Sequence, residues 1–165
     1  MDIGFIRVCD ETQTSELAGL AREIWFEHFP GIISTEQVSY MVEKYQSEEA
    51  ITRQIADDGY EYYFVSGEHG ILGYLAIKPE PGKLLLSKLY LKREHRGKGY
   101  FNGMLAFAER TAKEKGLTTL YLTVNRHNDR AITVYRKKGF EVIKETVTDI
   151  GGSFVMDDFV MEKVL

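Results

Sequence analysis

Arginine, lysine and two glycines stand together in the segment Arg96-Gly97-Lys98-Gly99, between an apolar run and a helix-forming run. Glycine lets a ligand approach the backbone closely, and the first N–H groups of a helix have no partner within the helix. The helix dipole adds positive character at the same place. The segment therefore predicts a phosphate-binding loop at a strand-to-helix turn, although a basic flexible turn without a ligand has the same composition.

Two common nucleotide-binding loops do not fit this segment. A Walker loop requires Ser or Thr after Gly-Lys, whereas Gly97-Lys98 is followed by Gly99. A dinucleotide fingerprint requires a third glycine, and Asn102 occupies that position. The remaining interpretation is a pyrophosphate that is held by backbone N–H groups without a metal ion.

A second segment, residues 125–142, also carries polar groups with a chemical use. Asn128 or Asp129 can cap the helix that follows the predicted turn. Tyr135 lies on that helix, and a tyrosine with an ordinary pKa of about 10 is protonated at neutral pH and can donate a proton. Taken alone, the segment also fits a capped helix with a core tyrosine.

The elements that hold these segments follow from apolar periodicity and from turn residues. The expected strands are 4–10, two within 60–79, 83–92, 118–124, 140–149 and 153–165, and the expected helices are 12–29, 39–45, 47–59, 99–116 and 128–139. This order predicts an α/β protein of the mixed α+β type, with a mixed sheet in a single domain of residues 1–165.

Composition narrows the classes of partner. The net charge of −4 gives no electrostatic reason to expect nucleic-acid binding. Cys9 is the only cysteine, so no internal disulfide is possible, and its apolar surroundings predict a core or half-buried thiol. No apolar run approaches the ~20 residues of a membrane span, and no signal peptide is visible. These features predict a cytoplasmic protein without membrane contact.

Together the two segments resemble the GNAT superfamily of N-acetyltransferases. The shared features are an apolar strand leading into HRGKGY, a helix, a strand, and then the pattern NxxNxxAxxxYxxxGF. The resemblance is close over about residues 72–142, and the N-terminal part matches only in the order of its elements. It implies a GNAT-like sheet of about seven mostly antiparallel strands, flanked by about four helices.

The resemblance implies acetyl-coenzyme A (acetyl-CoA) as the cosubstrate, with no metal ion. The loop backbone would bind the pyrophosphate, the preceding strand would pair with the pantetheine arm, and Tyr135 would protonate the leaving sulfur. The N–H of Leu91 or of a neighbour would stabilise the oxyanion. The residues so assigned to the cosubstrate are Leu89, Tyr90, Leu91, Arg96, Gly97, Lys98, Gly99, Tyr100, Phe101, Asn102, Asn128 and Tyr135.

Two positions depart from the family pattern. Phe101 stands where a small residue normally lets the helix approach its strand, so its ring is expected to point away from the loop while its N–H still binds phosphate. Ser87 stands where many relatives carry a glutamate that acts as the base. The alternative bases are Glu23, Glu27 and His28 in the first helix and Asp157 and Asp158 in the last strand, and the sequence selects none of them.

The acceptor side is expected to include Trp25, Phe26, His28 and Phe29, together with Ser87. Aromatic rings near carboxylates suit a cation, although the same residues fit a core-facing stripe. The segment GGSFVMDDFVMEK resembles the branch that includes bacterial polyamine N-acetyltransferases. The expected reaction is direct acetyl transfer to a small primary amine such as a polyamine, by a monomer or homodimer. The alternatives are a peptide or protein acceptor, and a CoA-binding sensor with little catalysis.

Overall fold

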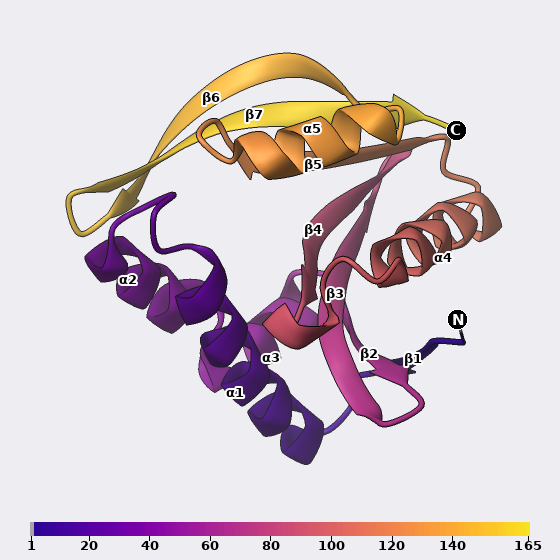
Figure 1. Cartoon of the computed structure of the whole chain (residues 1–165), viewed down its shortest axis with the longest axis horizontal. Helices are drawn as coiled ribbons and strands as arrows, with labels where there is room; N and C mark the ends of the chain where they lie inside the picture. The colour runs from indigo at the N-terminus through magenta and orange to yellow at the C-terminus, as the bar shows by residue number, and fades with distance from the viewer. Residues whose placement is uncertain (1) are drawn as a thin grey trace.

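The computed structural model describes residues 2–165 and consists of one sheet with helices on both faces (Figure 1). Its elements are β1 Gly4–Arg7, α1 Glu11–His28, α2 Thr35–Tyr45, α3 Glu48–Asp57, β2 Glu61–Gly67, β3 Gly70–Glu80, β4 Lys83–Leu91, a 3-10 turn Arg93–His95, α4 Tyr100–Glu114, β5 Thr119–Asn125, α5 Asp129–Lys137, β6 Glu141–Gly151 and β7 Phe154–Val164.

The mixed α/β class is confirmed, with the five α-helices that the periodicity predicted, one more than the roughly four that the family resemblance implied. α2 and α3 are separate helices because each has its own polar cap. Ser34 accepts a hydrogen bond from the N–H of Gln37, and Ser47 accepts one from the N–H of Ala50. Each serine satisfies an N–H group that would otherwise lack a partner at a helix start, so the two helices begin independently.

The seven strands pair in the order β1-β2-β3-β4-β5-β7-β6. All neighbours are antiparallel except β4 and β5, which run parallel. This arrangement confirms the expected mostly antiparallel mixed sheet. It also places the one parallel pair at the centre, between the strand that precedes the phosphate loop and the strand that precedes α5.

The two faces of the sheet carry separate apolar cores. On one face, α4 and α5 pack over buried side chains of β4 and β5, including Leu84, Leu86 and Leu120. On the other face, α1, α2 and α3 pack over Tyr62 and Tyr74. Figure 1 shows α4 and the α1–α3 group on opposite sides of the central strands. Side chains of a strand alternate between these faces, so each position in β4 points to one core or the other.

β4 and β5 pair over only three residue pairs, Lys83–Leu85 with Thr119–Tyr121. Beyond these pairs the strands separate, and Figure 1 shows the opening between them. We call this opening the splay. The register between β3 and β4 shifts where Ala76 pairs with Lys88 and Ile77 pairs with Leu86, so Ser87 is the extra residue of a β-bulge. A bulge bends its strand and locally disrupts pairing, which fits the position where β4 leaves β5.

A buried chain of hydrogen bonds joins α1, α2 and α3 beneath the sheet. Trp25 Nε1 donates to the hydroxyl of Tyr74, which donates to Gln46 Oε1. Gln46 Nε2 donates to the hydroxyl of Tyr62, which donates to Gln54 Oε1. Because every polar group in this chain finds a partner, the burial of so much polar surface carries little penalty.

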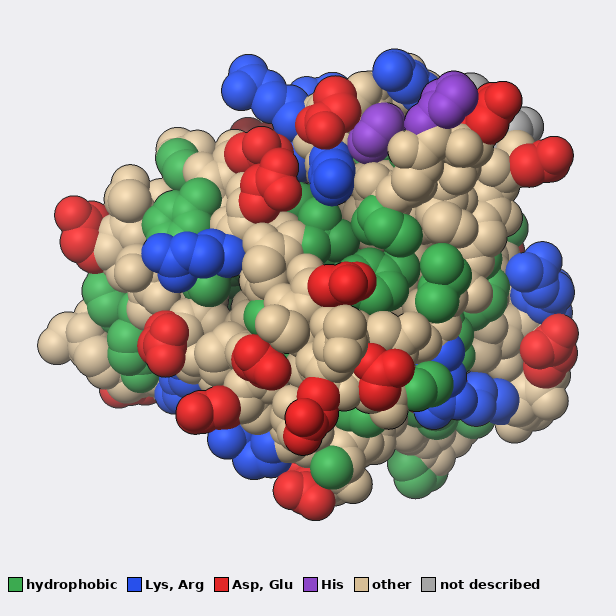
Figure 2. All heavy atoms as spheres, turned by 90° about the horizontal axis from the view of Figure 1, so that it is seen from below, with side chains coloured by type: hydrophobic (Ala, Val, Ile, Leu, Met, Phe, Trp, Pro, Cys, Tyr) green, Lys and Arg blue, Asp and Glu red, His purple; other side chains and the backbone are tan. Residues whose placement is uncertain are grey.

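One sequence-based expectation is wrong: Cys9 is exposed rather than buried. Val8 is the buried residue of this segment, and its neighbour therefore points outward on the extended backbone. Figure 2 shows acidic and basic side chains interspersed around an apolar area on the face seen from below, in accord with the small net charge. Among residues 2–165, no helix has both the length and the apolar character that a membrane crossing requires.

Candidate active site

The segment Gly97–Phe101 forms a cradle of free backbone donors at the start of α4. Gly97 and Gly99 have positive φ angles of 75° and 88°, in the left-handed region that glycine adopts without strain. Within residues 2–165, no backbone or side-chain acceptor takes a hydrogen bond from the N–H groups of positions 97 to 101. Successive N–H groups in such a turn make an anion-binding concavity. The amide of Arg96 is not part of the cradle, because it donates to the carbonyl of Arg93.

Phe101 directs its ring away from this cradle. The ring packs against the core beneath α4, and its centroid lies 5.8 Å from the ring centroid of Tyr135. Gly103 lets the side chain of Ile3 pack directly against α4, since a Cβ atom at position 103 would lie 2.6 Å from Cδ1 of Ile3. The missing small residue at position 101 therefore leaves the loop open.

Basic side chains lie on the loop that forms the cradle. Arg96 Nε donates to the carbonyl oxygen of Leu91 at 3.0 Å, while Lys98 and Asn102 are exposed. Burial, followed by the charges of Arg96 and Arg130, lowers the pKa of His28 to about 4. His28 is therefore neutral at physiological pH. Arg130, in the first turn of α5, was not among the predicted site residues. The one sequence signal for it was its position two residues after the Asn128 cap.

The backbone of β4 offers hydrogen-bonding groups to the splay. Lys92 N–H donates to the carbonyl of Leu72, so Lys92 and, by alternation, Tyr90 form the hydrogen-bonded pairs with β3. Leu89 and Leu91 are the intervening residues, and their N–H and C=O groups point away from β3 and toward the splay. Their side chains belong to the core under α4 and α5.

The bulge brings Ser87 and Lys88 together on the same side of β4. Lys88 Nζ donates to Ser87 Oγ at 2.8 Å and also to its carbonyl oxygen. Burial lowers the pKa of Lys88 to about 8, and within residues 2–165 no carboxylate forms an ion pair with this amine. Sequence reasoning missed Lys88, although a lysine inside the apolar run KLLLSKLYL was a visible signal.

Tyr135 lies in α5 and Asn128 is its N-cap, so both follow β5 on the other side of the splay. Asn128 caps α5 by accepting a hydrogen bond from the N–H of Ala131, which leaves its NH₂ group free. Tyr135 packs between Phe101 and Phe140, and burial raises its pKa. Burial is the main cause that raises the pKa of Tyr90, the residue of β4 at this level, and ionisation of Tyr135 would raise it further.

An aromatic wall surrounds Tyr90 on the α1 side. Ring centroids of Trp25, His28 and Phe29 lie 5.9, 5.8 and 6.0 Å from that of Tyr90. Trp25 is buried and hydrogen-bonded to Tyr74, so it forms the base of this wall. Phe26 is not part of it, because the guanidinium of Arg22 lies over its ring on another side of α1.

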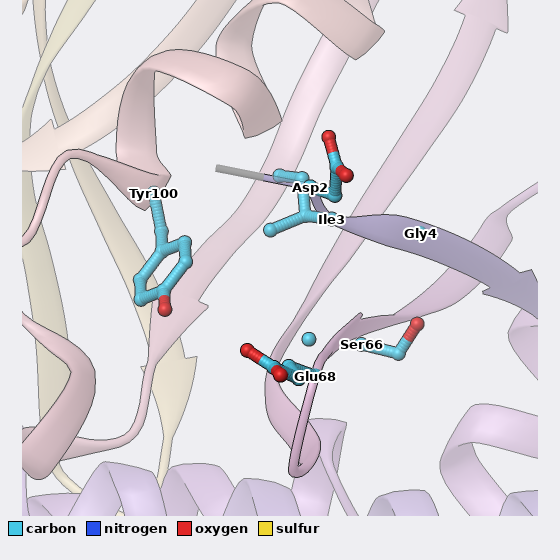
Figure 3. Close-up of a pocket in the computed structure, with 7 residues that line it drawn as sticks. Asp2, Ile3, Gly4, Ser66, Glu68 and Tyr100 are labelled. Carbon is cyan, nitrogen blue, oxygen red and sulfur yellow. The ribbon is translucent and has the colours of Figure 1, made fainter.

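A separate hollow of about 670 Å³ lies at the β1–β2 edge, away from the splay. Figure 3 shows Tyr100 on one side of it and Asp2 and Glu68 on the others. Tyr100, the first residue of α4, is the one predicted site residue on its lining. Two carboxylates make this hollow unsuited to a phosphate.

The fold and the cradle define an acetyltransferase, and comparison with known proteins agrees. Residues 18–140 match the acetyltransferase (GNAT) family. The chain therefore belongs to this family, and its acetyl donor is acetyl-CoA.

Individual relatives cover nearly the whole chain. Spermidine N(1)-acetyltransferase of Thermoplasma acidophilum is 32% identical over 151 residues, which are 89% of this chain and 88% of that protein. The crystal structure of PaiA N-acetyltransferase from the same organism, in complex with coenzyme A, superposes with a TM-score of 0.80 at 28% identity, covering 100% of both chains. A GCN5-related N-acetyltransferase from Rhodopseudomonas palustris has a TM-score of 0.82 at 15% identity, over 100% of this chain and 97% of that one.

Proposed function

We propose that this enzyme transfers the acetyl group of acetyl-CoA to the primary amine of a small cationic acceptor, with a polyamine as the first candidate. The observation that carries the cosubstrate assignment is the juxtaposition of two sets of backbone groups. Five free N–H donors at positions 97 to 101 suit a pyrophosphate, and the edge of β4 at Leu89 and Leu91, where Arg96 takes only the carbonyl of Leu91, suits the amides of a pantetheine arm. Arg96, Lys98 and Arg130 add positive charge nearby.

In the proposed reaction, the ammonium group of the acceptor first loses a proton to solvent, because only the neutral amine can attack. Its nitrogen then bonds to the acetyl carbon of acetyl-CoA, and the C–S bond of the thioester breaks. The N–H of Leu91 points into the splay, where it stabilises the developing oxyanion. Tyr135 donates a proton to the sulfur, since its raised pKa keeps the hydroxyl protonated at neutral pH. Asn128 uses its free NH₂ group to hold the cosubstrate beside α5. One proton leaves to solvent for each acetyl group transferred.

The acceptor assignment is supported by the aromatic wall and by the relationship to a spermidine acetyltransferase. Aromatic faces attract cations, and the wall presents Phe29 and Tyr90 beside a histidine that carries no charge at neutral pH. Ser87 contributes a hydroxyl from the bulge and holds the amine of Lys88. A cytoplasmic location and a monomeric or homodimeric state remain predictions.

The test follows the release of free CoA from acetyl-CoA with a panel of polyamines, other alkyl amines, amino acids, aminoglycosides and peptides. The proposal expects the highest kcat/KM for a polyamine or another small alkyl amine. A preference for peptides would show a protein acceptor instead.

One observation favours a second candidate, a CoA-binding sensor: Ser87 and Lys88 occupy the bulge where a carboxylate base would be expected. Tight binding of CoA, measured by calorimetry, without turnover of any amine would favour the sensor and overturn the enzymatic proposal.

A further inference from the structure

The neighbouring carboxylates of β7 serve opposite faces of the sheet. Asp157 Oδ1 accepts a hydrogen bond from Arg126 Nε at 2.8 Å. Asp158 lies on the other face, with Phe154 and Met156, whose side chains pack in the core under α1–α3. Only 6% of Asp158 is exposed, so its charge is held inside the protein rather than on its surface.

Asp158 lies at the same level of the sheet as Tyr90. In β5 its pairing partner is Asn125, the last residue of that strand. Counting along β4 and β5 from the pair Lys83–Thr119, and allowing for the bulge at Ser87, brings Tyr90 level with Asn125. Tyr90 and Asp158 also point to the same face, so the register places the two side chains near each other at the splay. Burial, followed by nearby acidic groups that include Asp158, raises the pKa of Tyr90.

Three polar groups at this place have no partner. Within residues 2–165, no hydrogen bond joins the carboxylate of Asp158 or the hydroxyls of Tyr90 and Tyr135 to any other group. No fully buried side-chain nitrogen or oxygen in the same range lacks a hydrogen-bond partner. Each of the three groups therefore reaches open space. A carboxylate that is nine-tenths buried without a partner is costly unless something outside the chain binds it.

A cation is the partner that this carboxylate requires. Arg126, which follows the residue that pairs with Asp158, is bound to Asp157 and Glu145 on the other face. Lys88 donates to Ser87 instead. Burial, followed by the charge of Asp157, raises the pKa of Asp158 to about 6, so most of the carboxylate is still ionised at pH 7 and above.

We infer that Asp158 binds the ammonium group of the acceptor and so selects cationic amines for this enzyme. The inference rests on the proposed function and deepens it, because it assigns acceptor recognition to one carboxylate. The cation would approach past the rings of Phe29 and Tyr90, and would reach Asp158 at the level of Tyr90. The amine then lies at the splay, between the edge of β4 and the acid on α5.

The experiment compares four full-length proteins: the wild type, Asp158→Asn, Asp158→Glu and Asp157→Asn. Calorimetry measures the binding of spermidine to each protein saturated with CoA, where no reaction takes place. Steady-state kinetics then give kcat and KM for the best amine of the panel and for acetyl-CoA. Asp157→Asn is the matched control, since it removes an adjacent carboxylate from the opposite face, and thermal melting verifies that each variant is folded.

Asp158→Asn is expected to weaken spermidine binding and to raise the KM of the amine by about 10- to 100-fold, as the loss of a charge-assisted hydrogen bond predicts. CoA binding should remain within about threefold, and Asp158→Glu should bind spermidine better than Asp158→Asn because it keeps the charge. Asp157→Asn should match the wild type within about threefold, because its ion pair is partly exposed.

Two results would overturn the inference. The first is equal binding of spermidine to the wild type and to Asp158→Asn. The second is an equal loss of amine and CoA binding, which would indicate a structural role. If the wild type still acetylates amines in either case, the proposed function stands without this residue. If the wild type neither binds spermidine nor acetylates any amine, both proposals fail.

Discussion

Arg96 Nε donates to the carbonyl oxygen of Leu91 at 3.0 Å, and this bond joins the phosphate cradle to the last residue of β4. Arg96→Ala removes that link together with a positive charge beside the cradle. We expect the KM for acetyl-CoA to rise by about 10-fold or more, in line with the loss of a charged hydrogen bond, while kcat changes less. Steady-state kinetics with acetyl-CoA varied provide the measurement. Arg110→Ala, on the exposed side of α4, is the control, and equal effects of both variants would contradict the assignment.

The left-handed conformation of Gly97 gives a test of the cradle that does not change its charge. A Cβ atom at this position would meet nothing within 4 Å, so alanine tests the φ angle of 75° alone. That conformation costs a non-glycine residue roughly 1–2 kcal/mol. Gly97→Ala should therefore weaken CoA binding by about 5- to 30-fold, as measured by calorimetry.

Gly19 is a glycine for which alanine should be favourable rather than strained. It lies inside α1 and is exposed, and a Cβ atom at this position would also meet nothing within 4 Å, but its φ is not positive. Gly19→Ala should stabilise the protein by about 0.5–1 kcal/mol in denaturant unfolding, since alanine favours a helix over glycine. CoA binding should not change, and a loss of stability would show that the helix is constrained in some other way.

Tyr135→Phe tests the proposed acid with the ring retained. The contacts with Phe101 and Phe140 persist, so folding should be unaffected. The kcat at neutral pH should fall by about 100-fold or more, the range expected for a lost general acid. Because the pKa of Tyr135 is raised, wild-type activity should show no loss from its ionisation up to about pH 10. An unchanged kcat in the variant would exclude this role.

Lys88 predicts a pH dependence of stability. Its pKa is about 8 in the folded protein and about 10.5 when unfolded, so the folded state releases its proton first. The penalty for burying the charge is complete below pH 8, and stability rises as the pH increases from about 8 to 10.5. Lys88→Met should remove this rise and stabilise the protein at pH 7 by about 2 kcal/mol, after allowance for partial exposure. Denaturant unfolding at pH 7 and pH 9.5 measures both effects; a parallel pH response in the two proteins would contradict it.

The order of helices and strands could be predicted from the sequence because each run carried its own periodicity and its own caps. The phosphate cradle was equally local, since positions 97 to 101 follow one another in the chain. Phe101 was the exception to the family pattern, and its ring found the expected place because the apolar core under α4 accepts it.

The groups around the splay could not be predicted in the same way. Asp158 lies near Tyr90 because β7, the last strand of the sequence, pairs with β5 near the centre of the sheet and lies between β5 and β6. Alternation in the sequence showed that Asp157 and Asp158 face opposite sides, but only the strand order decides which side is the site. The direction of the Lys88 side chain could not be predicted for a related reason. The bulge at Ser87 changes the face of the sheet to which the following residues point.

The short contact between β4 and β5 divides the sheet mechanically into a four-stranded part and a three-stranded part. Three residue pairs at Lys83–Leu85, next to a hydrogen bond from the N–H of Thr118 to the carbonyl of Gly82, connect their main chains. A pantetheine arm seated along Leu89 and Leu91 would add main-chain hydrogen bonds at the place where β4 and β5 no longer pair. The ligand would then complete the architecture of the protein as well as supply its chemistry.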